Sequence, residues 1–120
     1  MTEKELDAAI AKLCRLYGWR RYHTYRSKRS PAGFPDLVLV KPPRLIFAEL
    51  KSDDGKVSAE QAEWALDLEA VSEACRERMI AGHPPSNVEA FVWRPRDLDA
   101  IARILAPRIV SPYAYPRPGG

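Results

Sequence analysis

Three segments of the chain carry hydrophobic residues at helical spacing. The first covers residues 3 to 17 and ends before Gly18, a residue type that commonly terminates helices. The second begins at Ser58, and the residues that recur along one of its faces are Gln61, Trp64, Leu68, Val71, Cys75 and Met79. The third follows Asp97, a favourable N-cap residue. The pattern therefore predicts three helices.

Four short segments between these helices have the composition of β-strands. Loosely alternating aromatic and basic residues favour a strand at 19 to 25, and apolar runs predict strands at 36 to 40, 45 to 51 and 88 to 93. Pro42 and Pro43 form a turn that makes the middle pair antiparallel, whereas the strand, helix, strand unit predicts a right-handed parallel crossover. We expect an α/β fold in the order αβββαβα, with a small mixed sheet flanked by helices.

Length and composition are those of one globular domain. The chain has 120 residues, of which 46% are hydrophobic and 29% charged, which argues against a wholly disordered protein. We expect a domain at residues 1 to 106 and a proline-rich tail at 107 to 120, which lacks periodicity. The polar first residues and the lack of an apolar run of about 18 residues argue against a secretory signal and a membrane span. These features favour a cytoplasmic protein.

The two cysteines lie far apart in the sequence, each within a helical pattern. Cys14 and Cys75 have neither Cys-x-x-Cys spacing nor paired histidines beside them. Reduced thiols packed in the core are therefore expected, rather than a disulfide or a zinc site.

Charge is distributed unevenly, although the net charge is only +3. Residues 8 to 35 contain no acidic residue, and their seven cations are Lys12, Arg15, Arg20, Arg21, Arg26, Lys28 and Arg29. Such a segment is typical of a surface that binds a polyanion, although a merely solvated surface has the same composition. Residues 49 to 77 are acidic instead.

The expected hairpin brings ionisable groups together at one end. With a four-residue loop at 41 to 44, Asp36 lies opposite Glu49, and Lys51 shares the face of Glu49. Like charges directly opposed across two strands are destabilising, and a divalent metal ion between the carboxylates would remove the repulsion. Oxygen ligands of this kind suit Mg²⁺ or Mn²⁺. A capped loop and a surface ion pair are the structural alternative.

The spacing of these residues resembles the PD-(D/E)xK nuclease signature, and a longer set of residues resembles its VRR-NUC branch. The matching residues are Gly33-Phe34-Pro35-Asp36-Leu37-Val38, Phe47-Ala48-Glu49-Leu50-Lys51, Gly55-Lys56-Val57-Ser58, Gln61, Trp64, Glu5, Gly18-Trp19, His23 and Val92-Trp93-Arg94-Pro95. The resemblance implies a restriction-endonuclease-like fold and metal-dependent hydrolysis of DNA phosphodiester bonds, often in branched structures such as four-way junctions or flaps.

The resemblance also assigns roles to individual residues. It implies that Asp36, Glu49 and the carbonyl of Leu50 bind Mg²⁺ or Mn²⁺, and that Lys51 is the catalytic lysine. Two further residues join the catalytic set, because Glu5 matches an outlying glutamate that is a further metal-ligand candidate, and Gln61 matches a glutamine on the following helix. Both also fit capping boxes, with Thr2 and Ser58 as the caps, so capping alone could explain them.

Residues next to the expected site are candidates for contacting DNA. The loop that precedes Asp36 is basic, and a phosphate backbone near the carboxylates would have to pass it. The candidates are Arg20, Arg21, His23, Arg26, Lys28, Arg29 and Ser30. His23 is also a residue type that is more often structural than functional.

Three functions remain open from the sequence. The first is a DNA endonuclease that acts in replication, recombination or repair, and the others are an inactive nucleic-acid-binding module of the same fold and an RNA nuclease. A domain of this size has little surface for reading sequence in a groove, which favours recognition of DNA structure. Cutting a junction requires two active sites, so we expect a homodimer with twofold symmetry.

Overall fold

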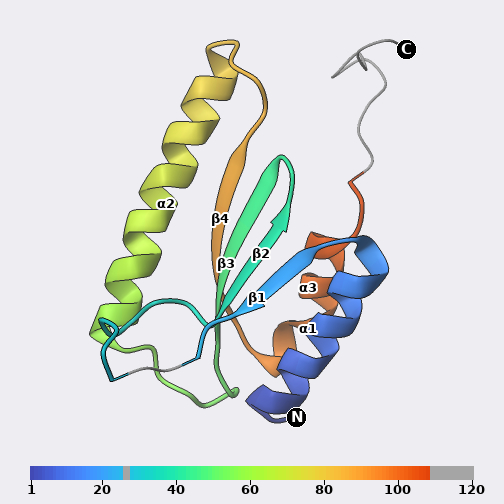
Figure 1. Ribbon diagram of the computed structural model, residues 1–120, viewed down its shortest axis with the longest axis vertical. Coiled ribbons are helices and arrows are strands. Elements are labelled where there is room, and N and C mark those ends of the chain that lie inside the picture. Colours follow the sequence, from blue (N-terminus) through green and yellow to red (C-terminus); the bar gives the residue numbers. More distant parts are fainter. Residues whose placement is uncertain (26–27, 109–120) are drawn as a thin grey trace.

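The computed structural model describes residues 1–25 and 28–108, and its element order is the predicted αβββαβα with one added 3₁₀ turn (Figure 1). The elements are α1 (Glu3–Tyr17), β1 (Arg20–His23), β2 (Leu37–Lys41), β3 (Arg44–Leu50), α2 (Ala59–Ile80), β4 (Asn87–Trp93), η1 (Pro95–Asp97) and α3 (Leu98–Leu105). Most of the predicted tail lies outside the described residues, which end at Arg108.

The four strands form one mixed sheet in the order β1-β2-β3-β4. The first two pairs are antiparallel and β3 runs parallel to β4, as the connection through α2 requires. Val38 lies opposite Phe47, which confirms the predicted register of the hairpin. The predicted four-residue loop is wrong, because Lys41 and Arg44 still pair and only two prolines make the turn.

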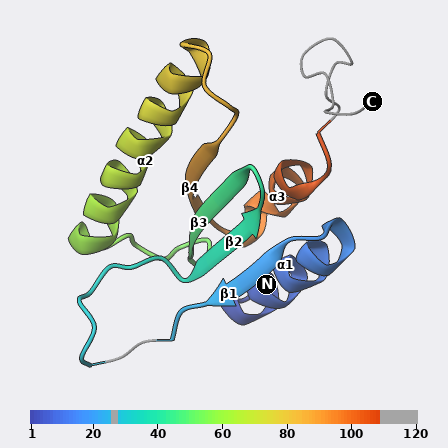
Figure 2. The same ribbon diagram turned by 45° about the horizontal axis from the view of Figure 1, so that its top comes forward.

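Helices cover the two faces of the sheet unequally. Helices α1 and α3 pack together on one face, and α2 runs along β4 on the other (Figures 1 and 2). The fully buried side chains lie on the first side and are Leu6, Ile10, Cys14, Leu37, Leu39, Ile46, Ile101 and Leu105. Alternation along β2 and β3 turns Leu37, Leu39, Ile46 and Leu50 to this side. The hydrophobic core is therefore a sheet face covered by two helices.

Helix α1 begins and ends as its sequence predicts. Thr2 and Glu5 form a capping box, with Thr2 Oγ1 accepting from Glu5 N–H and the Glu5 carboxylate accepting from Thr2 N–H, both at 3.1 Å. Gly18 adopts the left-handed conformation, with φ of 79°, and its N–H donates to the carbonyl of Cys14. The cap groups thus fix where the helix starts and where the chain turns into β1.

Helix α2 begins directly after Ser58, as predicted, and extends past Met79, but its apolar face is not buried. None of its residues is fully buried, and Trp64, Val71 and Met79 are each more than one third exposed. The prediction of a core thiol holds for Cys14 and is wrong for Cys75, which is only partly buried, and both cysteines are free. The reason is that α2 meets the sheet along its β4 edge, so half of the apolar stripe faces outward. No helix among the described residues has both the length and the apolar composition needed to cross a membrane.

Asp97 occupies the predicted N-cap position of α3, but its side chain does not cap that helix. Its carboxylate accepts instead from the N–H of Arg94, at 2.9 Å, which closes the 3₁₀ turn η1. The turn lets the chain leave β4 and cross the end of the sheet to the face that α1 covers (Figure 2).

A nearly buried ion pair ties the sheet to the end of α3. Arg44 donates to both carboxylate oxygens of Glu89 at 2.8 Å and to the carbonyl of Ile104 at 2.8 Å. Its guanidinium lies 4.9 Å from the ring centroid of Trp19, whose indole N–H donates to Leu105 O. Two carbonyls that α3 leaves without helical partners are thereby satisfied by side chains.

We expect Arg44→Ala to lower the free energy of unfolding by about 3 kcal/mol or more, because Glu89 would remain buried with its main partner removed. Arg76→Ala is the control, since Arg76 pairs with Glu73 where both side chains are 59% exposed, and it should cost less than about 1 kcal/mol. Urea unfolding curves measure both changes. Equal effects of the two substitutions would contradict the account of this ion pair.

Candidate active site

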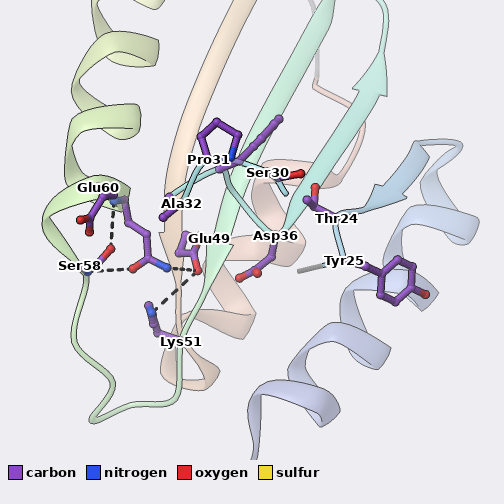
Figure 3. Close-up of a pocket in the computed structure, with 13 residues that line it drawn as sticks. Thr24, Tyr25, Ser30, Pro31, Ala32, Asp36, Glu49, Lys51, Ser58 and Glu60 are labelled. Atoms are coloured by element: carbon purple, nitrogen blue, oxygen red, sulfur yellow. Dashed lines mark hydrogen bonds and ion pairs between the residues drawn. The ribbon is translucent and has the colours of Figure 1, made fainter. Parts of the chain in front are cut away.

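A pocket of about 440 Å³ opens where β3 ends and α2 begins. Its lining residues come from the end of β1, the loop before β2, β3 and the first turn of α2, and are Thr24, Tyr25, Ser30, Pro31, Ala32, Gly33, Phe34, Asp36, Glu49, Lys51, Ser58, Glu60 and Gln61. Figure 3 shows Asp36, Glu49 and Lys51 gathered on one side of it, with Tyr25 pointing away from them. Four of the five predicted catalytic residues therefore meet at one pocket.

The register of the hairpin brings the two carboxylates together. Leu37 pairs with Ala48, so Asp36 precedes β2 at the level of Glu49. Asp36 Oδ2 accepts a hydrogen bond from the N–H of Leu50 at 2.8 Å. This bond fixes the Asp36 side chain against the end of β3.

Glu49 is buried, with 7% of its surface exposed. Its Oε1 accepts from the side-chain amide of Gln61 at 2.8 Å, and the ammonium of Lys51 lies 3.9 Å from the same oxygen. Its Oε2 is also buried and has no hydrogen-bond partner among the described residues. A buried carboxylate oxygen without a partner is costly for stability alone.

Burial, together with the adjacent Asp36 carboxylate, raises the pKa of Glu49 to about 8 against the opposing effect of Lys51. Removal of the carboxylate from water disfavours its charged form, and a second negative charge beside it does the same. Near neutral pH the pocket therefore has a proton on the Glu49 carboxyl that a bound cation would displace.

Gln61 performs the capping role and the site role at once. Its N–H donates to Ser58 Oγ at 3.1 Å and its Oε1 accepts from Ser58 N–H at 2.9 Å, which completes the predicted capping box. Its remaining amide hydrogens face Glu49. The start of α2 is thus fixed by the same side chain that orients a site carboxylate.

The loop before β2 is packed tightly against α2. Gly33 has φ of +99°, and a Cβ there would lie 2.6 Å from the backbone carbon of Glu60, so only glycine fits. Phe34 stacks on Trp64 with ring centroids 5.1 Å apart and also contacts Phe47 at 6.0 Å. These contacts hold one wall of the pocket.

The predicted DNA-contacting residues divide into two groups. Arg21 forms an ion pair with Asp7 of α1, and His23 Nε2 lies 3.6 Å from the same carboxylate. Asp7, the residue directly before the acid-free segment, therefore partly neutralises both, and their contact with phosphate stays a prediction. Arg20, Lys28, Arg29 and Ser30 are exposed, and Ser30 lines the pocket, whereas Arg26 lies outside the described residues.

Glu5 is not brought to the described pocket. Its carboxylate is held by the capping box, and the hydrogen bonds from Thr2 lower its pKa. The charge of Glu3, not Glu5, acts on Glu49 and contributes to its raised pKa. Side chains two positions apart on a helix point in directions about 200° apart. Glu5, held in the cap, therefore lies on the opposite side of α1 from Glu3. Glu5 is therefore explained by capping in this structure, and its role at the site stays a prediction.

The donor set fits a hard divalent cation. Asp36 and Glu49 offer carboxylate oxygens, one of which is buried without a partner in the described part of the chain, and Leu50 offers a backbone carbonyl at the end of β3. Within the described parts of the chain, no group of three or more His, Cys, Asp or Glu side chains converges. Mg²⁺ is commonly bound through one or two carboxylates and keeps several waters, which matches this set.

Sequence reasoning missed Thr24 and the arginine at the end of β4. Thr24 lines the pocket, its N–H donates to Asp36 O at 2.7 Å, and its buried Oγ1 has no partner among the described residues. Its position just before the basic loop was the one feature of the sequence that could have identified Thr24 as a pocket residue. Arg94 appeared only among the residues that carry the resemblance. Its contact with Gly55, 39 residues earlier in the chain, cannot be predicted from the spacing of residues in the sequence.

Comparison with protein-family models, with curated proteins and with solved structures finds no match to this chain. The geometry of the pocket therefore carries the functional argument.

The raised pKa of Glu49 predicts that stability falls as pH rises. Between about pH 4.5 and about pH 8 the folded protein keeps a proton that the unfolded chain releases, so the free energy of unfolding should fall by up to about 5 kcal/mol across that range. Glu49→Gln should remove most of this slope. Urea unfolding at several pH values, with a chelator present, measures it.

Glu63→Gln is the matched control, because Glu63 is exposed on α2. It should keep the slope of the unsubstituted protein. A Glu49→Gln variant with that same slope would show that Glu49 titrates like an exposed glutamate.

Proposed function

We propose that this protein is a metal-dependent nuclease that hydrolyses DNA phosphodiester bonds, with a preference for branched DNA. The observation that carries the proposal is the buried Glu49 beside Asp36: Lys51 lies 3.9 Å from Glu49 Oε1, and Oε2 has no hydrogen-bond partner among the residues that the structure describes. Stability alone gives no reason to place a buried carboxylate directly beside a second one at the ends of apolar strands. A site that binds a divalent cation next to a polyanionic substrate explains why the two carboxylates lie together.

The roles of the residues follow from their chemistry. Asp36, Glu49 and the Leu50 carbonyl would hold Mg²⁺ or Mn²⁺, which when bound supplies charge stabilisation at a phosphodiester oxygen and lowers the pKa of water. The Lys51 ammonium would orient the attacking water and neutralise charge that develops on the phosphate. Gln61 donates to Glu49 and keeps its carboxylate directed into the pocket.

The distribution of charge around the pocket supports a nucleic-acid substrate. Exposed Lys28 and Arg29 lie in the loop that leads into the pocket wall at Ser30. The first turn of α2 lines the other wall, and the exposed acids along this helix would repel phosphates. A phosphate backbone would therefore approach along the loop and away from α2.

A homodimer is part of the proposal when the substrate is a four-way junction. Two strands must be cut, and a twofold dimer supplies two pockets. Sedimentation at micromolar concentration, with and without junction DNA, measures this state, and a mass of one chain in both cases would argue against it.

End-labelled DNA substrates test the activity. A four-way junction, a flap, a splayed arm and a linear duplex are incubated with Mg²⁺, Mn²⁺ or a chelator, beside an RNA of matched structure. We expect metal-dependent cleavage of a branched DNA, because the carboxylates need the cation and the loop needs a backbone to bind. Asp36→Ala should reduce cleavage to the chelator background, and Asp67→Ala, which removes an exposed carboxylate on α2, should not.

The alternatives give different results in the same assay. Binding without cleavage in either metal would favour an inactive nucleic-acid-binding module, and preferential cutting of the RNA would favour an RNA nuclease. Cleavage that survives both the chelator and Asp36→Ala would place the activity elsewhere in the preparation.

A further inference from the structure

Arg94 follows the last residue of β4, and its side chain reaches the loop that comes after Lys51. Its Nη1 donates to the carbonyls of Ser52 and Gly55, each at 2.7 Å. The carbonyl of Asp53 lies 3.4 Å from the same nitrogen. One guanidinium therefore contacts three carbonyls of the four-residue turn at 52 to 55, an arrangement that the single ammonium of a lysine does not reproduce.

The same loop is held at two other points. The N–H of Arg96 donates to the Asp53 carboxylate at 3.1 Å, and its guanidinium approaches the Asp53 carbonyl at 3.3 Å. The N–H of Lys51 donates to the carbonyl of Trp93 at 3.0 Å. The backbone on which Lys51 sits is thus attached to the end of β4, next to Arg94.

The loop in turn contacts the side chain of Lys51. A Cβ built on Gly55 would lie 3.4 Å from both Cβ and Cδ of Lys51, so the Gly55 backbone packs against the aliphatic part of that lysine. The Lys51 ammonium lies 3.9 Å from Glu49 Oε1. Contact along the stem limits the rotamers of a side chain that would otherwise have four free torsions.

We propose that Arg94 is the positioning residue for the Lys51 ammonium: by fixing the carbonyls of Ser52 and Gly55, it holds Gly55 against the lysine stem. The inference rests on the proposed nuclease function for its kinetic consequence. Its structural consequence, the contact between Gly55 and Lys51, does not depend on that function. Arg94 touches neither the pocket nor its carboxylates among the described contacts, so it acts through Lys51.

Single-turnover cleavage of the preferred branched DNA tests the kinetic consequence. Arg94→Lys keeps the positive charge and should lower the rate at saturating DNA by roughly 10- to 100-fold, because displacement of a catalytic group by about 1 Å costs this much. The DNA concentration at half-maximal rate should stay unchanged. Arg96→Lys is the matched control, since its backbone bond to Asp53 survives, and should keep the wild-type rate.

A double-mutant cycle separates positioning from general loosening of the structure. In a Lys51→Ala background, Arg94→Lys should cause almost no further loss, because the lysine that it positions is gone. An equal loss with and without Lys51 would overturn the proposal, as would a wild-type rate for Arg94→Lys. Unchanged thermal unfolding of Arg94→Lys would show that the fold is intact.

Nuclear Overhauser contacts between the Gly55 α-protons and the Lys51 side chain provide a readout without cleavage. They should be present in the wild-type protein and in Arg96→Lys and be lost in Arg94→Lys. If the wild-type protein cuts no substrate, the proposed function fails, and this measurement still decides the role of Arg94. Retention of the contacts in Arg94→Lys would overturn that role.

Discussion

The site depends on the burial of one carboxyl group beside another at the end of β3. Glu49 and Asp36 repel each other when both are charged, and the fold stabilises the arrangement with donors from the sheet and from α2. Leu50 N–H holds Asp36, and the Gln61 amide holds one oxygen of Glu49. The second Glu49 oxygen has no partner among the described residues. The arrangement is thus destabilising in the absence of a bound positive charge, and destabilising local features of this kind are common at functional sites.

Much of this arrangement follows from local rules. A strand alternates its side chains with period two, so the register of a hairpin closed by Pro42 and Pro43 decides that Asp36 meets Glu49. Capping boxes are equally local, because a threonine or serine and a residue three positions later find each other within one turn. These features could be predicted from sequence because few residues and little tertiary packing determine them.

The features that could not be predicted depend on how elements pack. Arg21 and His23 belong to a basic segment by sequence, yet the angle of α1 against β1 brings Asp7 to them. Helix α2 has an apolar stripe, but the sheet offers it one edge, so Trp64 and Val71 stay largely exposed. In both cases the local sequence pattern was read correctly, but tertiary packing decided which residues lie next to it.

Anomalous diffraction from crystals soaked in Mn²⁺ tests most directly whether the carboxylate pair is a cation site. The measurement belongs at about pH 8 or above, where the pKa of Glu49 allows ionisation. The account predicts an anomalous peak within coordination distance of oxygens from both Asp36 and Glu49. Full soaking without a peak at these oxygens, in crystals that bind Mn²⁺ elsewhere, would contradict it.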